Sequence, residues 1–192
     1  MSFTWSEQDE LGRLRLATVV TAATAAASAR RDYLEQDRLS WRTQALMWPA
    51  YLLGGAVVIT SAIRARATGT PNSRSVGVML SAAGLTLFAA GARPFASFAQ
   101  LAGRETGDLI TDGAYRYSRN PQYAGNVLLS AGTAVAARSV PGAVFTLAVA
   151  AAYRAYVVAE EAHLERAFGS EYRRYRDRTP RWFGSPREDD ER

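Results

Sequence analysis

The chain contains no cysteine and no lysine, and its only histidine is His163. Without cysteine it forms no disulfide, iron–sulfur cluster or thiolate zinc site. Without lysine it forms no Schiff base, and it lacks the lysine of a phosphate-binding P-loop. A single histidine also argues against a Ser-His-Asp triad and against a histidine-based metal centre. We therefore expect no metal site.

All the basic side chains are arginines, and the 192 residues carry a formal net charge of +5. A basic excess suits either nucleic acid or an anionic membrane surface. The charges are concentrated in the first 42 residues, around 104–119 and after 160. The uncharged runs between these regions favour a membrane, so we expect membrane lipids as partners and no nucleic acid.

Four uncharged runs predict membrane-spanning helices, which need about 20 mostly apolar residues each. The runs cover 43–63, 75–92, 120–137 and 139–153, and the last continues past Arg154 to Glu160. The first run is the strongest candidate for a span. The four runs fit two helical hairpins, and the second hairpin has a tight turn at 138–142. A soluble helical bundle is the alternative, but soluble helices usually have a polar face, which these runs lack.

The run 16–29 is uncharged but consists mainly of Ala, Thr and Ser. It fits a short extra span, an interfacial helix, or a helix that packs on the bundle through small residues. We favour the bundle-associated helix. The acidic residues before it, among them Glu7 and Asp9, argue against a cleaved signal peptide.

These patterns predict an all-α fold: a polytopic membrane helical bundle with four or five transmembrane helices and a cytosolic C-terminal helical cap. We expect a single domain over 1–192. Its parts are an N-terminal helical region (1–42), a first transmembrane hairpin (43–92), a cytosolic loop (93–122), a second hairpin (123–159) and a cytosolic tail (160–192).

Arginine bias near the spans predicts the orientation, because cytoplasmic loops are enriched in basic residues. The arginines of the loop 93–119 are Arg93, Arg104, Arg116 and Arg119, and those of the N-terminal region are Arg30, Arg31, Arg38 and Arg42. The tail after 166 is richer still. We expect all three regions in the cytosol and the protein in the bacterial cytoplasmic membrane, although the arginines of 64–74 then lie outside against the rule.

The first collection of polar residues lies between Leu109 and Gly125. Asp112-Gly113 is typical of a turn, and Asn120-Pro121 is typical of a helix start. The segment should be a structured loop that enters the third span at the membrane boundary. A belt of interfacial tyrosines is the alternative.

The second collection begins with Arg154 and continues through Glu160 and Glu161. Arg154 and Glu161 are seven residues apart and share a helical face. An ionisable side chain in a membrane is a functional candidate, and a snorkelling arginine beside solvated glutamates is the alternative.

Beyond the acidic pair, Leu164, Phe168 and Tyr172 form an i, i+4 stripe that suits packing. Gly169-Ser170 predicts a helix end followed by a new N-cap. A short amphipathic helix should then cover 171–177 on the membrane surface.

These two collections resemble the motifs of the isoprenylcysteine carboxyl methyltransferase and phospholipid N-methyltransferase superfamily. The residues that match the first motif are Gly113, Tyr115, Arg119, Asn120, Pro121, Tyr123 and Gly125. Those that match the second are Glu160, Glu161, Leu164, Phe168, Gly169, Tyr172, Tyr175, Pro180 and Arg181. The resemblance covers about 109–183.

The resemblance implies S-adenosylmethionine as cofactor, in a cytosol-facing pocket, and a lipidic or isoprenoid small-molecule substrate that enters from the bilayer. It implies catalytic roles for Arg154 and Glu161. The cofactor-binding residues that it implies are Tyr115, Arg119, Asn120, Pro121, Tyr123, Gly125, Glu160, Glu161, His163, Leu164 and Tyr172. The carboxylates would face the positive sulfur and the amino group of the cofactor.

Three positions depart from the family pattern. The histidine of the first motif is Asn120, and Tyr156 stands where the carboxyl methyltransferases have an arginine. Arg154 is the candidate to replace that arginine. We expect His163 to be a surface residue, with a role as a base for an amine or hydroxyl acceptor as the alternative.

Two other functions compete with a methyltransferase. The first is an NADPH-dependent membrane reductase of the sterol-reductase type, in which the tail arginines would bind the extra phosphate. The second is a non-catalytic membrane protein that retains the fold. The methyl acceptor, which could be a carboxylate, an amine or a hydroxyl, and the oligomeric state cannot be read from the sequence.

Overall fold

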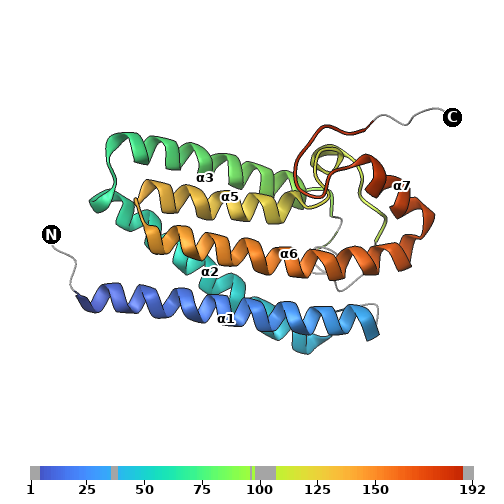
Figure 1. Cartoon of the computed structure of the whole chain (residues 1–192), viewed down its shortest axis with the longest axis horizontal. Helices are drawn as coiled ribbons and strands as arrows, with labels where there is room; N and C mark the ends of the chain where they lie inside the picture. The colour runs from blue at the N-terminus through green and yellow to red at the C-terminus, as the bar shows by residue number, and fades with distance from the viewer. Residues whose placement is uncertain (1–4, 36–38, 96, 98–106, 188–192) are drawn as a thin grey trace.

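The computed structural model describes residues 5–35, 39–95, 97 and 107–187. Within these residues the regular structure is helical throughout (Figure 1), which confirms the all-α prediction. The helices are α1 (Trp5–Glu35), α2 (Trp41–Thr68), α3 (Pro71–Ala92), α5 (Pro121–Ala136), α6 (Val140–Phe168) and α7 (Ser170–Arg178), and η1 (Gly113–Arg116) is a 3₁₀ turn. Arg38 and Arg104, used above for the orientation, lie outside the described residues.

Three of the described helices, α2, α3 and α6, are long and apolar enough to cross a membrane. They contain the predicted runs 43–63, 75–92 and 139–153. The third predicted span forms α5, which has 16 residues and is shorter than a usual span. The number of crossings therefore stays a prediction.

Local signals set the ends of the first hairpin. The Ser40 side chain accepts a hydrogen bond from the backbone N–H of Thr43 and caps α2. Thr70 and Ser73 form a capping box at the start of α3, where Pro71 is the first helical residue. In the second hairpin, Arg138 has a φ of 50° in the predicted tight turn before α6.

The helices α3 and α5 lie side by side (Figure 1) and approach through glycines. A Cβ atom on Gly84 would lie 2.4 Å from the backbone nitrogen of Leu129. A Cβ atom on Gly125 would lie 2.6 Å from the carbonyl oxygen of Gly84. Only glycine allows two helix backbones to approach this closely, as is common in membrane bundles.

The helix α1 packs against α2 and α6, in agreement with the bundle-associated alternative for 16–29. Ala29 and Tyr33 are buried there. Asp32 accepts hydrogen bonds from the backbone N–H of Ser40 at 2.7 Å and from the Thr43 hydroxyl. These bonds hold the start of α2 against the end of α1.

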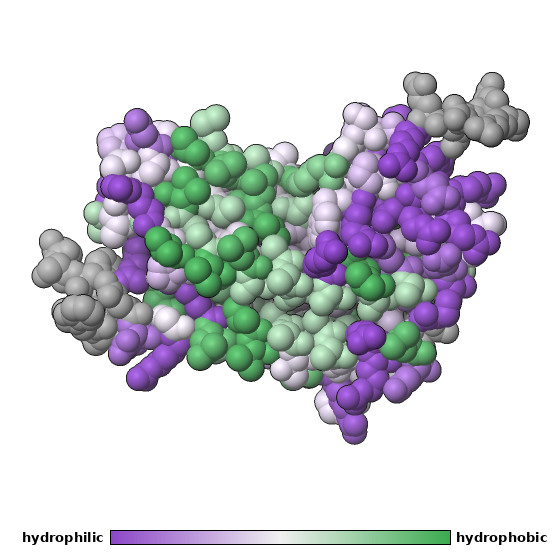
Figure 2. Space-filling view, viewed as in Figure 1, coloured by the Kyte–Doolittle hydropathy of each residue, from purple (hydrophilic) through white to green (hydrophobic). Residues whose placement is uncertain are grey.

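The bundle has two distinct ends. The α2–α3 and α5–α6 turns lie at one end, and η1, α7 and the chain that follows α7 lie at the other (Figure 1). Apolar side chains cover the middle of the bundle in the view of Figure 2, whereas hydrophilic side chains dominate around α7. The predicted amphipathic helix 171–177 is present as α7, with Gly169 and not Ser170 as its N-cap.

Candidate active site

The loop of the first motif is anchored to the end of α3. Gly113 has a φ of 62° and begins η1, which buries Tyr115. The Tyr115 hydroxyl donates a hydrogen bond to the carbonyl oxygen of Gly91 at 3.2 Å. Gln122, the second residue of α5, donates to the same carbonyl at 3.0 Å and fixes the loop from its other side.

The segment after α7 lies along this loop and is bonded to it through backbone and side chains. The Arg119 N–H donates to the carbonyl oxygen of Pro180 at 3.0 Å, and the Gly184 N–H donates to that of Tyr117 at 3.2 Å. The Asn120 side chain donates to the carbonyl oxygen of Arg181 at 3.1 Å. Asn120 therefore holds the C-terminal segment in place.

Glu161 joins the loop and this segment to α6. Its carboxylate pairs with Arg119 at 2.9 Å and with Arg181 at 2.6 Å, and the Glu161 and Arg119 side chains are only 11% and 9% exposed. The hydrogen bonds from Arg181 to Glu161 raise the pKa of the guanidinium above its ordinary value. Two guanidinium groups thus neutralise one carboxylate, which leaves it little attraction for a cationic molecule. We call these three side chains the clasp.

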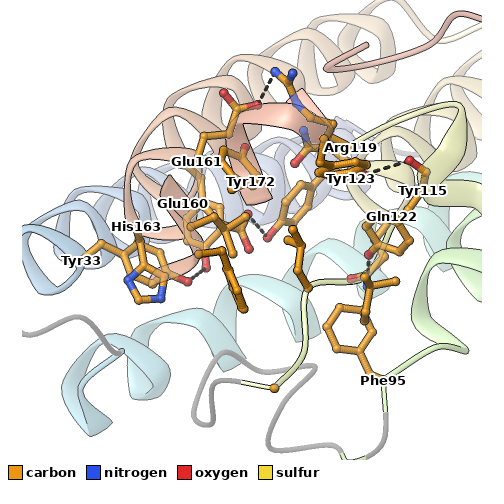
Figure 3. A pocket seen from close by; sticks show the side chains of 18 of the residues that line it. Tyr33, Phe95, Tyr115, Arg119, Gln122, Tyr123, Glu160, Glu161, His163 and Tyr172 are labelled. Atoms are coloured by element: carbon orange, nitrogen blue, oxygen red, sulfur yellow. Dashed lines mark hydrogen bonds and ion pairs between the residues drawn. The ribbon is translucent and has the colours of Figure 1, made fainter. Parts of the chain in front are cut away.

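Glu160 has a different environment. Its carboxylate accepts a hydrogen bond from the Tyr123 hydroxyl at 3.2 Å. The described part of the chain provides it with no cationic partner. Figure 3 shows Glu160 pointing into the space between Tyr123 and His163, while Glu161 points away towards Arg119. The two neighbouring glutamates therefore have different surroundings: Glu161 pairs with the arginines of the clasp, and Glu160 faces the aromatic residues.

Aromatic rings surround Glu160. Tyr33 of α1 stacks on His163 with ring centroids 4.8 Å apart, and its hydroxyl lies 3.2 Å from that of Tyr156. Tyr123 makes an edge contact with Tyr156 at 5.6 Å. His163 is buried, so the expectation that it is a surface residue is wrong. The reason is that α1 covers this face of α6, which the sequence of α6 alone does not show.

These residues line a cavity of about 430 Å³, a size typical of small-molecule sites. Its walls come from α1, α2, α3, α5, α6, α7 and the loop around η1. The predicted site residues that line it are Tyr115, Arg119, Asn120, Tyr123, Glu160, Glu161, His163, Leu164 and Tyr172. The two motifs thus meet in space, as expected.

Three predicted site residues lie outside the cavity lining. Gly125 is buried against Gly84 and Phe88 of α3, and Pro121 lies beside Gly91. Both are helix-packing residues. Arg154 is exposed on α6 and does not line the cavity.

Tyr172 has a polar atom without a partner. Its side chain is 1% exposed and lines the cavity, yet its hydroxyl has no hydrogen bond to any described residue. Burial raises the pKa of Tyr172 above its ordinary value, so the hydroxyl keeps its proton. A buried hydroxyl without a partner is costly, which marks it as a group available to a bound molecule.

Sequence reasoning missed the contribution of the first two helices. Tyr33 of α1 lines the cavity together with Gln44, Met47, Trp48 and Tyr51 of α2. The α2 residues recur at helical spacing and so share a face, but in an apolar span that spacing does not distinguish a cavity wall from lipid contact. Arg181 was noted only as part of a motif, and its ion pair was not anticipated.

Comparison with known proteins supports the assignment of these motifs. No curated protein and no solved structure shows a significant match to the chain. The family model described as "Phospholipid methyltransferase" matches residues 73–171, which is more than half of the chain and includes η1, α5 and α6. With both motifs in place around one cavity, the chain belongs to the phospholipid methyltransferase family.

Proposed function

We propose that the protein is an integral membrane methyltransferase that uses S-adenosylmethionine and methylates a lipidic acceptor at the cytosolic face of the membrane. The observation that carries the proposal is Glu160, a carboxylate that lies in an aromatic cavity next to the clasp and has no cationic partner among the described residues. Family membership supports methyl transfer and a lipid substrate. The donor, the acceptor and the orientation are our inferences.

The cavity suits this cofactor chemically. A sulfonium or an ammonium group is stabilised by a carboxylate and by the faces of aromatic rings, which Glu160, Tyr123 and Tyr156 provide. The Tyr172 hydroxyl can donate a hydrogen bond that no described residue accepts. Glu160 would hold the cationic part of the cofactor, and the aromatic rings would hold its flat part.

When bound, S-adenosylmethionine supplies a methyl group on a positively charged sulfur. The protein then has to align the two reactants and exclude water, and needs no acid–base triad for this. The clasp contributes by holding the loop and the C-terminal segment over the cavity. In this view Glu161 and Asn120 are positioning residues, because their polar atoms bond to the protein's own Arg119 and Arg181.

Calorimetric titration of the detergent-solubilised protein tests the proposal. We expect S-adenosylmethionine and its demethylated product to bind and NADPH not to bind. The Glu160→Gln variant should prefer the neutral product relative to the cationic donor, because the carboxylate favours positive charge. Binding of NADPH in place of the donor would identify a reductase instead, and binding of none of the three would indicate a non-catalytic protein.

A further inference from the structure

The cavity has walls of two origins. Residues such as Tyr123 and Glu160 belong to the segment that matches the family. Another part of the lining comes from α1 and α2, which lie outside the match. Its members on α2 are Gln44, Met47, Trp48 and Tyr51, which we call the α2 wall.

The α2 wall is continuous with the outer surface of the bundle. Trp48 and Tyr51 line the cavity and are also 44% and 45% exposed, so their rings lie at its rim. Leu52, the next residue along, is 70% exposed. Because α2 is a candidate membrane span, we expect hydrocarbon around this rim.

Polar groups also line the cavity. Asp108 is exposed, and the Glu160 carboxylate accepts a hydrogen bond from the Tyr123 hydroxyl. A molecule that uses both these polar groups and the apolar rim has a polar group and a hydrocarbon chain. A water-soluble cofactor has no chain to place along Trp48 and Tyr51.

We propose that the α2 wall binds the hydrocarbon part of the methyl acceptor and determines which lipids are methylated. This inference rests on the proposed function and adds specificity-determining residues to it. Met47 is held in place by the buried cluster of Ala29, Tyr33 and Tyr156, so it presents a fixed surface. Trp48 packs edge to face on Tyr51 at 6.4 Å and forms the rim.

The test uses the full chain in detergent micelles, with a total bacterial phospholipid extract as acceptor and methyl-labelled S-adenosylmethionine as donor. The variant is Trp48→Ala, with Trp48→Leu as a milder second variant. Leu52→Ala is the matched control, since Leu52 is an exposed apolar residue of the same helix outside the cavity lining. Mass spectrometry identifies the chain lengths of the labelled lipids, and calorimetry measures donor binding.

We expect Trp48→Ala to raise the apparent KM for lipid by about fivefold and to broaden the chain-length distribution of the products, with the kcat and donor Kd changed less than about twofold. Leu52→Ala should behave as wild type. Unchanged lipid dependence in both Trp48 variants overturns the inference and leaves the proposed function intact. Weaker donor binding in Trp48→Ala also overturns it, because the wall would then hold the cofactor. Absence of labelled lipid with the wild type overturns the proposed function as well.

Discussion

At the scale of single residues, the adjacent Glu160 and Glu161 have the same side chain but different electrostatic surroundings. Glu161 is neutralised by two guanidinium groups, whereas among the described residues Glu160 has the Tyr123 hydroxyl as its one hydrogen-bond partner. A buried ion pair that loses one member leaves the other charge buried and uncompensated. Substitution of the two residues should therefore affect different properties of the protein.

We expect Glu161→Gln to lower thermal stability and Glu160→Gln to weaken binding of S-adenosylmethionine. The first leaves Arg119 buried without a counter-charge, which costs about 3 kcal/mol. The second removes the carboxylate that faces the cavity and should raise the donor Kd about tenfold, or about 1.4 kcal/mol. Thermal unfolding and calorimetry separate the two effects.

Glu165→Gln is the control, because Glu165 pairs with Arg176 at the surface and lies outside the cavity lining. It should leave both the melting temperature and the Kd close to those of the wild type. Loss of donor affinity in Glu161→Gln without loss of stability would contradict the role of the clasp.

Asp32 makes a pH-dependent contribution to stability. Burial alone would raise its pKa, but hydrogen bonds from Thr43 and Ser40 outweigh burial and lower the pKa below its ordinary value. The ionised form is thus stabilised by folding. The contribution of the Asp32 carboxylate to the free energy of unfolding is present above the ordinary aspartate pKa of about 4. This contribution is lost as the pH falls through the lower pKa of the folded state.

At pH 7, Asp32→Asn should therefore lower the free energy of unfolding by about 1–2 kcal/mol. The variant should melt at a lower temperature than the wild type. The difference should narrow as the pH falls below about 4. Melting curves of both proteins over a pH series measure this. A difference that is constant with pH would show that the Asp32 charge is irrelevant.

At the scale of elements, the contact between α3 and α5 depends on glycine. A side chain on Gly84 would meet the backbone of α5, which cannot move aside without separating the helices. Gly55 of α2, by contrast, has no described atom within 4 Å of an added Cβ. The two positions make a matched pair.

We expect Gly84→Ala to destabilise the protein by about 1–3 kcal/mol through overpacking. Gly55→Ala should be neutral or stabilising by about 0.5–1 kcal/mol, since alanine favours helix. The melting temperatures of the two variants in one detergent measure the difference. Equal melting temperatures would show that α3 and α5 are not in close contact.

The helices were predictable to the extent that their signals are local. The uncharged runs 43–63 and 75–92 identified α2 and α3, because hydropathy and flanking charges belong to neighbouring residues. The partners of Glu161 were not predictable, since Arg119 and Arg181 are brought together only by the tertiary fold. The seven-residue spacing of Arg154 and Glu161 predicted a shared helix face. Spacing alone does not show which residues of that face are covered by other parts of the chain.

The wall of the cavity was missed for a similar reason. Tyr33 follows a run of small residues that carries no sign of a binding site, and its contact with His163 joins α1 to α6. The motif residues, in contrast, were recognised from the sequence, because their spacing resembles the family pattern. Of these, Pro121 and Gly125 support the packing of α5, since motif membership does not distinguish a binding residue from a supporting one.

At the scale of the whole molecule, the hydrophilic end with α7 and the α2–α3 turn lie at opposite ends of the bundle (Figure 1). We expect these two ends to face different compartments in the membrane. The chain has no cysteine, so single cysteines report on either end without a background.

We expect Asn72→Cys to react with a membrane-impermeant maleimide in intact spheroplasts and Arg187→Cys to react only after lysis. Asn72 is exposed at the start of α3, and Arg187 is exposed after α7. Arginine bias places the latter inside. Labelling of Arg187→Cys in intact cells would reverse the orientation and place the cavity on the outer face.

The clasp also has a consequence for biogenesis. Arg181 is synthesised after every described helix, yet it contacts Glu161 of α6 and lies along the chain that precedes α5. A nascent chain that has inserted α6 still holds Glu161 with one of its two guanidinium partners. We therefore expect the clasp to be completed only after α6 has been inserted and the C-terminal segment has been synthesised.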